Sequence, residues 1–237
     1  MAQHGLIRIR DADLGLRPEA RALNASFRTD VPILKLSVEI DWDPSDSLAA
    51  LAAVEKRLVA LCPSLREHEC RGREEYHILR STDGDGGSPE GSETAIEPEL
   101  ALAHLYEHVM IDTVAFVTDE PIVSGATAAL EGSRNRFDVF VEAPDELAAR
   151  LAVGLATRWV SALAIGNSLN GDGRAALELV RFLYRTHPDA AEADEIARDL
   201  GWEPRAVRDG LDWLERSGLT HRVSYTMNFS GLPYYGL

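Results

Sequence analysis

The stretch that decides the fold is "LALAHLYEHVMIDTV", from Leu100 to Val114. Apolar residues recur through it at helical spacing and surround most of its circumference, so we expect a largely buried helix. His104 and His108 are four residues apart, which places them about 40° apart on one face of that helix. Glu107 follows His104 by three residues and shares this face. The stretch therefore predicts a core helix with a polar stripe.

The polar stripe has the residue types of a metal site. Two imidazoles at this spacing can bind one tetrahedral Zn²⁺. A carboxylate beside them, here Glu107, can take a proton from a metal-activated water, and His-x-x-Glu-His is the inverted zincin order. Asp112 lies four residues beyond His108, where it is a candidate third ligand or a residue that orients a histidine. The alternative is a helix whose polar residues share a face by chance.

Length, composition and net charge limit the classes of protein to which this chain can belong. The chain has 237 residues with 45% hydrophobic residues, which is enough for one large or two small domains. A net charge of −15 disfavours general affinity for nucleic acids. The sequence shows no apolar run of the roughly 18 residues that a membrane helix needs, and its first residues do not form a signal peptide. We therefore expect a cytoplasmic protein with no membrane partner, in which Cys62 and Cys70 are reduced.

The periodicity along the chain predicts an α+β fold. Short alternating stretches indicate strands, longer stretches with helical spacing indicate helices, and one acidic segment rich in Gly and Ser indicates a mobile loop. The expected strands are 6–10, 32–42 and 75–81, with a hairpin over 125–143; the expected helices are 48–62 and 144–166, and the loop is 82–99.

The segment "NSLNGDG" (167–173) is the best candidate for a domain boundary. We expect an N-terminal mixed α/β-sandwich domain with an antiparallel sheet over residues 1–166, and a second domain over 171–237. The second domain is expected to hold three helices followed by two strand-like pieces, which is the winged helix-turn-helix pattern. The expected helices are 174–186, 193–200 and 203–217.

Charge decides what such a winged helix would bind. The candidate recognition helix carries Arg205 and Arg208 but also four acidic residues. Residues 171–237 hold eight arginines and no lysine against eleven acidic residues, whereas a DNA reader normally presents a basic face. DNA binding is therefore not favoured. The alternatives are a protein partner, a homodimer contact, or docking on the first domain.

Several motifs together resemble the N-terminal domain of cyanophycin synthetase, over roughly residues 6–163. "LIRIR" and "PILKLSVEID" resemble its first strands, "AHLYEHVMID" its His-x-x-Glu-His helix, and "RFDVFVE" a strand that ends in glutamate, here Glu142. The closest piece is "RLVALCPSLREHECRG". Its matching positions are Leu61, Pro63, Leu65, His68, Cys70 and Gly72.

The resemblance implies a domain that holds a peptide polymer and, in some members, has metallopeptidase-like activity at the helix. The ligase domains of that family are absent from these 237 residues. The order of helix and hairpin also resembles pitrilysin-type metallopeptidases, whose third ligand is a carboxylate further along the chain. The family's basic turn appears here as "GATA" (125–128), so Arg134 and Arg136 are the candidates for contacting substrate instead.

Our functional hypothesis is a zinc-dependent peptidase or amidase acting on a peptide or protein substrate. His104 and His108 would bind Zn²⁺, Glu107 would activate water, and Asp112 or Glu142 would complete the ligand set. The alternative is a non-catalytic, peptide-binding regulator that carries a winged-helix domain for DNA or protein.

Overall fold

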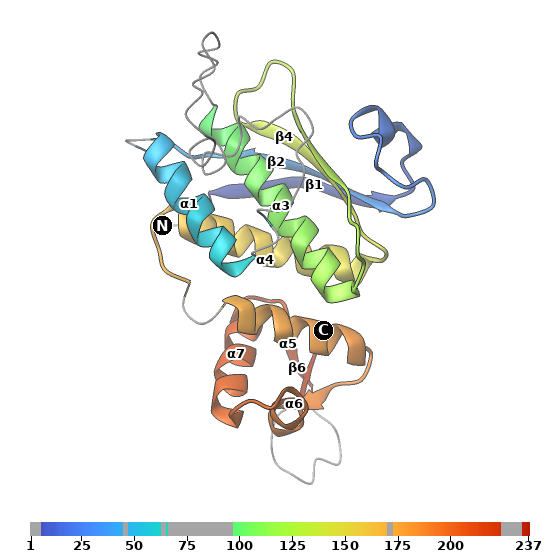
Figure 1. Ribbon diagram of the computed structural model, residues 1–237, viewed down its shortest axis with the longest axis vertical. Helices are drawn as coiled ribbons and strands as arrows, with labels where there is room; N and C mark the ends of the chain where they lie inside the picture. The colour runs from blue at the N-terminus through green and yellow to red at the C-terminus, as the bar shows by residue number, and fades with distance from the viewer. Residues whose placement is uncertain (1–5, 45–46, 63–64, 66–96, 170–172, 224–233) are drawn as a thin grey trace, which may run out of the picture.

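The computed structural model describes residues 6–44, 47–62, 65, 97–169, 173–223 and 234–237. Within them the chain combines helices with two antiparallel sheets, so the expected α+β class is confirmed (Figure 1). The expected strand at 75–81, nearly all of the expected loop, and four matched positions of the family resemblance (Pro63, His68, Cys70 and Gly72) lie outside the described residues.

The larger sheet has four strands in the order β1-β2-β4-β3, all antiparallel. Its strands are β1 (Ile7–Gly15), β2 (Ile33–Ile40), β3 (Gly125–Ala129) and β4 (Arg136–Glu142). β2 and β4 are the inner strands, and alternate residues of β2, such as Leu36 and Val38, are buried in the core. The predicted strand over 32–42 and the predicted hairpin are confirmed, whereas β1 runs beyond the predicted 6–10 as far as Gly15. A β-bulge between Ile9 and Asp11 interrupts its alternation.

Three long helices cover one face of this sheet (Figure 1). They are α1 (Ser47–Leu61), α3 (Pro98–Thr118) and α4 (Glu146–Ala164). α3 packs against β3 and β4, α4 packs against α3 and β1, and α1 contacts both helices. Pro98 stands in the first turn of α3, so the helix begins inside the range 82–99 that was expected to be a loop. A carboxylate oxygen of Asp145 accepts a hydrogen bond from the backbone N–H of Ala148 and caps α4.

Among the described residues, the cover on the other face of the sheet lies at one end. The short 3₁₀ helix η1 (Pro18–Ala22) and the chain after it place Ala20 and Phe27 over Ile33. Ala126 and Phe140 of this face pack against them, and charged residues such as Lys35 and Glu39 follow along β2.

The C-terminal residues form a second layer of helices with a small sheet. The helices are α5 (Gly173–Thr186), α6 (Ala193–Leu200) and α7 (Pro204–Arg216), close to the expected ranges. β5 (Ala191–Glu192), β6 (His221–Val223) and β7 (Tyr234–Gly236) pair in the order β5-β7-β6. β5 was not predicted, because two residues are too few for an alternating pattern to show.

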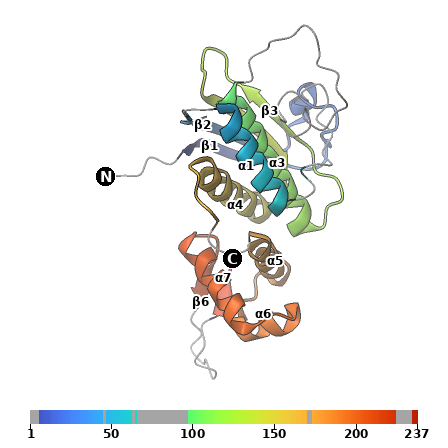
Figure 2. The ribbon, with the colours of Figure 1, turned by 60° about the vertical axis from the view of Figure 1, so that its left-hand side comes forward.

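The C-terminal elements share one hydrophobic core with the N-terminal ones. Figure 2 shows the C-terminal helices below α3 and α4. α5 packs against α3 and, more lightly, against α4. The Arg181 guanidinium lies 4.7 Å from the ring centre of Phe116, and both Arg181 and Arg185 pair with Asp119 at the end of α3. Leu219 sits directly on Gly154 of α4, where a Cβ atom would lie 2.2 Å from its Cδ2. The boundary predicted at 167–173 therefore lies between two helices, but one hydrophobic core continues across it.

Two helices have the length and composition of a membrane span. α3 and α4 both have a mean hydropathy of 1.3 over an 18-residue window, contrary to the expectation of no such run. However, 89% of the α3 window and 50% of the α4 window are buried inside the protein. Packing in the hydrophobic core accounts for the apolar character of the buried part of each helix.

The shared core predicts cooperative unfolding of both halves. Trp42 and Trp159 belong to the N-terminal elements, and Trp202 and Trp213 to the C-terminal ones. Far-ultraviolet circular dichroism and tryptophan fluorescence should give one coincident guanidinium transition, because α5 cannot leave α3 without exposing its core. The double variant Arg181→Ala/Arg185→Ala should lower that single midpoint. Two resolved transitions would show that the C-terminal part is an independent domain.

Candidate functional site

The polar stripe of α3 is buried as expected. His104, Glu107, His108 and Asp112 are between 3% and 7% exposed. Polar groups removed from water are costly unless other polar groups or an ion compensate them. Each of the four therefore has to be accounted for by its neighbours.

His104 and His108 point their Nε2 atoms at each other. These two atoms are 3.1 Å apart, and the rings meet edge to face with centres 4.5 Å apart. Two imidazoles on one tetrahedral Zn²⁺, with Zn–N distances of about 2.0–2.1 Å, would hold their nitrogens about 3.3 Å apart. The pair thus fits two ligand positions of a zinc ion. Without a metal, the same distance suits a hydrogen bond between the two rings.

Glu107 lies behind His104. Its Oε2 atom is 3.3 Å from His104 Nδ1 and accepts a hydrogen bond from the Thr127 hydroxyl on β3. A carboxylate at Nδ1 favours the tautomer with the proton on Nδ1, which leaves the Nε2 lone pair directed at His108. In this arrangement Glu107 orients a candidate ligand.

β3 is shaped to receive the Glu107 side chain. A Cβ atom on Gly125 would lie 2.7 Å from Glu107 Oε1 and 2.7 Å from Ile111 Cδ1, so no larger residue fits there without a shift. Gly125 and Thr127 are alternate residues of one strand and therefore face the helix together. Sequence reasoning assigned neither a role, although the alternation of the predicted hairpin could have placed them on one face.

Asp112 faces a different neighbourhood. Burial raises the pKa of the Cys62 thiol at the end of α1, and the nearby Asp112 carboxylate raises it further, while Arg174 opposes both effects. Asp112 therefore lies near Cys62, beside the end of α1. The structure does not bring it into a ligand group with the two histidines.

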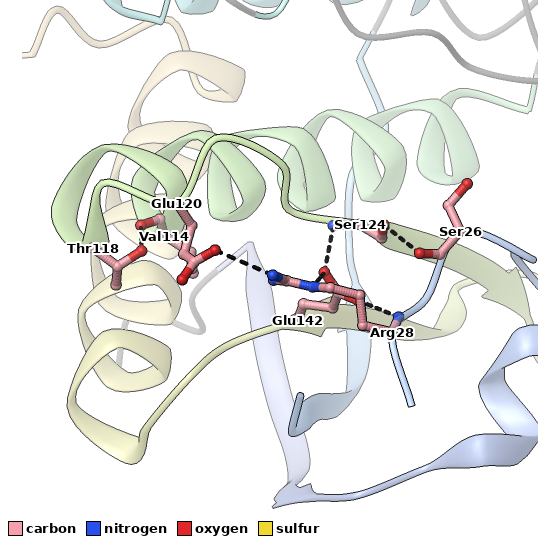
Figure 3. Close-up of polar contacts among 7 residues, drawn as sticks. All are labelled: Ser26, Arg28, Val114, Thr118, Glu120, Ser124 and Glu142. Carbon is pink, nitrogen blue, oxygen red and sulfur yellow. Dashed lines mark hydrogen bonds and ion pairs between the residues drawn. The ribbon is translucent and has the colours of Figure 1, made fainter. Parts of the chain in front are cut away.

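Glu142, the other candidate third ligand, is occupied elsewhere (Figure 3). Its carboxylate accepts hydrogen bonds from the backbone N–H of Arg28 at 2.6 Å, from Arg28 Nε at 3.1 Å, and from the backbone N–H of Ser124 at 3.2 Å. Arg28 also contacts Glu120 at 3.1 Å. Glu142 thus ties the segment before β2 to the connection between α3 and β3.

The described part of the chain contains no group of three His, Cys, Asp or Glu residues able to hold a metal. Of the predicted metal ligands, the imidazoles of His104 and His108 are the two that lie together. The structure offers no geometric support for Asp112 or Glu142 as the third ligand, and both assignments rest on the sequence.

The candidate substrate arginines lie away from the histidine pair. Arg134 is exposed in the connection between β3 and β4. Arg136 is opposite Glu39 of β2, and its Nε lies 3.6 Å from Glu39 Oε2. Because the next residue of β4, Phe137, is buried against the helices, Arg136 is on the opposite face of the sheet from α3.

The arginines of the candidate recognition helix have acidic neighbours. Arg208 Nη1 is 2.7 Å from Asp194 Oδ1, and Arg205 Nε is 4.0 Å from Asp209 Oδ2. Arg222 in β6 pairs with Asp212 and Glu215 of α7. These contacts reduce the positive field that the helix could present to phosphates.

Comparison with known proteins adds no assignment. Neither a protein-family model nor a curated protein matches the sequence. The candidate site therefore rests on its own geometry: the paired histidines, the carboxylate behind them and the strand that holds it.

The contacts of Glu142 predict what its loss would do. Glu142→Gln should lower the free energy of unfolding by about 2 kcal/mol, because charged hydrogen bonds are lost and an amide group then faces N–H donors. It should leave zinc binding unchanged. Denaturant titration and metal analysis measure both, and Glu131→Gln in the exposed turn is the matched control. Loss of zinc with unchanged stability would make Glu142 a ligand.

The charge contacts of α7 predict weak DNA binding. The wild-type protein at about 10 µM should not shift a short duplex at low salt, where non-specific binders normally do. The triple variant Asp194→Asn/Asp209→Asn/Asp212→Asn removes one acidic partner each from Arg208, Arg205 and Arg222, and it should bind DNA more tightly. A clear wild-type shift, weakened by Arg205→Ala/Arg208→Ala, would contradict this prediction.

Proposed function

We propose that the protein is a zinc-dependent hydrolase of peptide or amide bonds, with His104 and His108 as metal ligands. The observation that carries the proposal is the convergence of their Nε2 atoms, 3.1 Å apart, on a buried helix face. The carboxylate of Glu107 on the same face supports it further. The resemblance to the N-terminal domain of cyanophycin synthetase, with its metallopeptidase-like members, points the same way.

The chain's own residues supply orientation and proton transfer. Zinc, when bound, supplies the Lewis acidity that polarises a carbonyl and acidifies water. Glu107 holds the Nδ1 proton of His104 and keeps its Nε2 lone pair available. The Glu107 carboxylate also lies 3.3 Å from His104 Nδ1, so it is the candidate base that takes a proton from water and returns it to the leaving amine.

The two roles of Glu107 make different demands on its side chain. Orienting His104 needs the position that it has now, against Thr127. Acting as base needs the carboxylate to swing from Nδ1 towards the Nε2 side of the ring. Thr127 is then a positioning residue, because its hydroxyl sets where the carboxylate rests.

A non-catalytic regulator remains the second candidate, and the C-terminal part favours it. Its order α5-β5-α6-α7-β6-β7 with a three-stranded sheet supports this candidate, because it fits the pattern expected of a winged helix-turn-helix. The acidic neighbours of its arginines favour a protein surface over DNA as its target. If the protein is such a regulator, the two histidines are hydrogen-bonded to each other in the core and hold no metal.

Metal content and hydrolysis separate these readings. Purified wild-type protein should carry about one zinc per chain, and His104→Ala should lose it. Glu107→Gln should keep the metal and lower the rate of peptide hydrolysis by roughly 10²- to 10⁴-fold if Glu107 is the base. If Glu107 only orients His104, the same variant should lower zinc affinity by about 10- to 100-fold.

The control variant is His221→Ala, which removes an exposed histidine of β6. It should keep both metal and activity. Zinc content near zero after supplementation, with His104→Ala folded and indistinguishable from wild type, would overturn the hydrolase proposal.

A further inference from the structure

Within the part of the chain that the structure describes, β1 is an edge strand of the larger sheet. It pairs with β2 on one side, and it stands first in the strand order. Residues 9–13 are exposed, and Ile9, which faces the helix layer, is 41% exposed. An open edge of this length presents free backbone donors and acceptors to another strand.

The charges along β1 are self-complementary. The sequence "IRIRDADLG" places Arg8 and Arg10 in its first half, and Asp11 and Asp13 in its second half. If a second copy runs antiparallel to it about a centre between residues 10 and 11, Arg8 faces the second Asp13. Arg10 then faces the second Asp11. This register therefore brings four opposite-charge pairs together by symmetry.

Because of the β-bulge, the residues that pair in this register lie on the same face of the sheet. In a regular strand, residues whose numbers differ by an odd amount point to opposite faces, so Arg8 and Asp13 would not share one. Across β2, Arg8 is opposite Glu39 and Asp13 is opposite Lys35, which are alternate residues of the outer face. The extra residue at the bulge therefore places Arg8 and Asp13 on the same side.

The apolar residues of β1 follow the same symmetry on the other face. Ile7 and Leu14 would face each other across the two copies, as would Ile9 and Ala12. These four residues line an open groove of about 1310 Å³ between β1, α4 and the chain around Leu219. His104 and His108 are not among its lining residues, so the groove is separate from the candidate metal site.

We propose that two copies of the chain associate through antiparallel pairing of their β1 strands about residues 10 and 11, joining the two sheets into one. The charge palindrome sets the register, the bulge aligns the faces, and the exposed apolar residues of the groove edge become buried. Arg8 and Arg10, which already contact Glu39, then bridge it to the aspartates of the second copy. The proposal is independent of the proposed hydrolase activity.

Sedimentation equilibrium of the full chain at about 0.15 M salt tests the proposal. Wild-type protein should form a dimer, and D11K/D13K should weaken it by at least about 30-fold, because lysines then face arginines. E131K/D199K changes the net charge equally at exposed positions away from β1 and should dimerise like wild type. A monomeric wild type, or a D11K/D13K dimer of wild-type affinity, would overturn the proposal.

A charge exchange identifies the register. In R8E/R10E/E39Q, all four charged residues of β1 are acidic. The E39Q change removes the buried carboxylate that Arg8 and Arg10 pair with, so that it does not repel the new glutamates. This variant should be monomeric on its own. Mixed with D11K/D13K, it should form a one-to-one heterodimer. If either variant fails to fold, hydrogen exchange of wild-type β1 amides decides: protection should rise with protein concentration, and protection that does not change would refute the dimer.

Discussion

The rest of the structure depends on burying the polar stripe of α3. His104, Glu107, His108 and Asp112 are all less than 8% exposed at the centre of the molecule. Moving such groups out of water costs free energy that apolar packing cannot return. The fold meets this cost for three of them with specific contacts: histidine against histidine, and Glu107 against Thr127 and His104.

The elements around α3 are arranged to make those contacts. β3 supplies a glycine and a threonine under Glu107, and Glu142 fixes the connection that leads from α3 to β3. α5 closes the far end through Arg181 and Arg185 at Asp119. The C-terminal part therefore packs against the same hydrophobic core and covers it. This packing is a physical reason for the presence of the C-terminal part, whatever that part binds.

Periodicity in the sequence predicted most of the elements, because α1, α3, α4 and the three C-terminal helices each bury a continuous apolar face. It ended β1 too early, since Asp11 and Asp13 of an edge strand remain in water and the bulge breaks the alternation. The His104–His108 pair followed from the i, i+4 spacing alone. A contact set by one helix turn is local, so it can be predicted without knowing the fold.

The third ligand could not be predicted in this way. Each step of four residues advances about 40° around a helix, so Asp112 has turned about 80° from His104 and about 140° from Glu107. It therefore lies near Cys62 at the end of α1. Glu142 finds its partner in Arg28, 114 residues away in a segment without periodicity. Such contacts depend on tertiary packing, which spacing does not encode.

X-ray absorption at the zinc edge of the zinc-loaded protein would show whether the paired imidazoles of α3 hold a metal ion. We expect outer-shell scattering from two imidazoles, with Zn–N distances of about 2.0–2.1 Å. A spectrum without imidazole scattering, unchanged in a folded His104→Ala variant, would contradict this expectation.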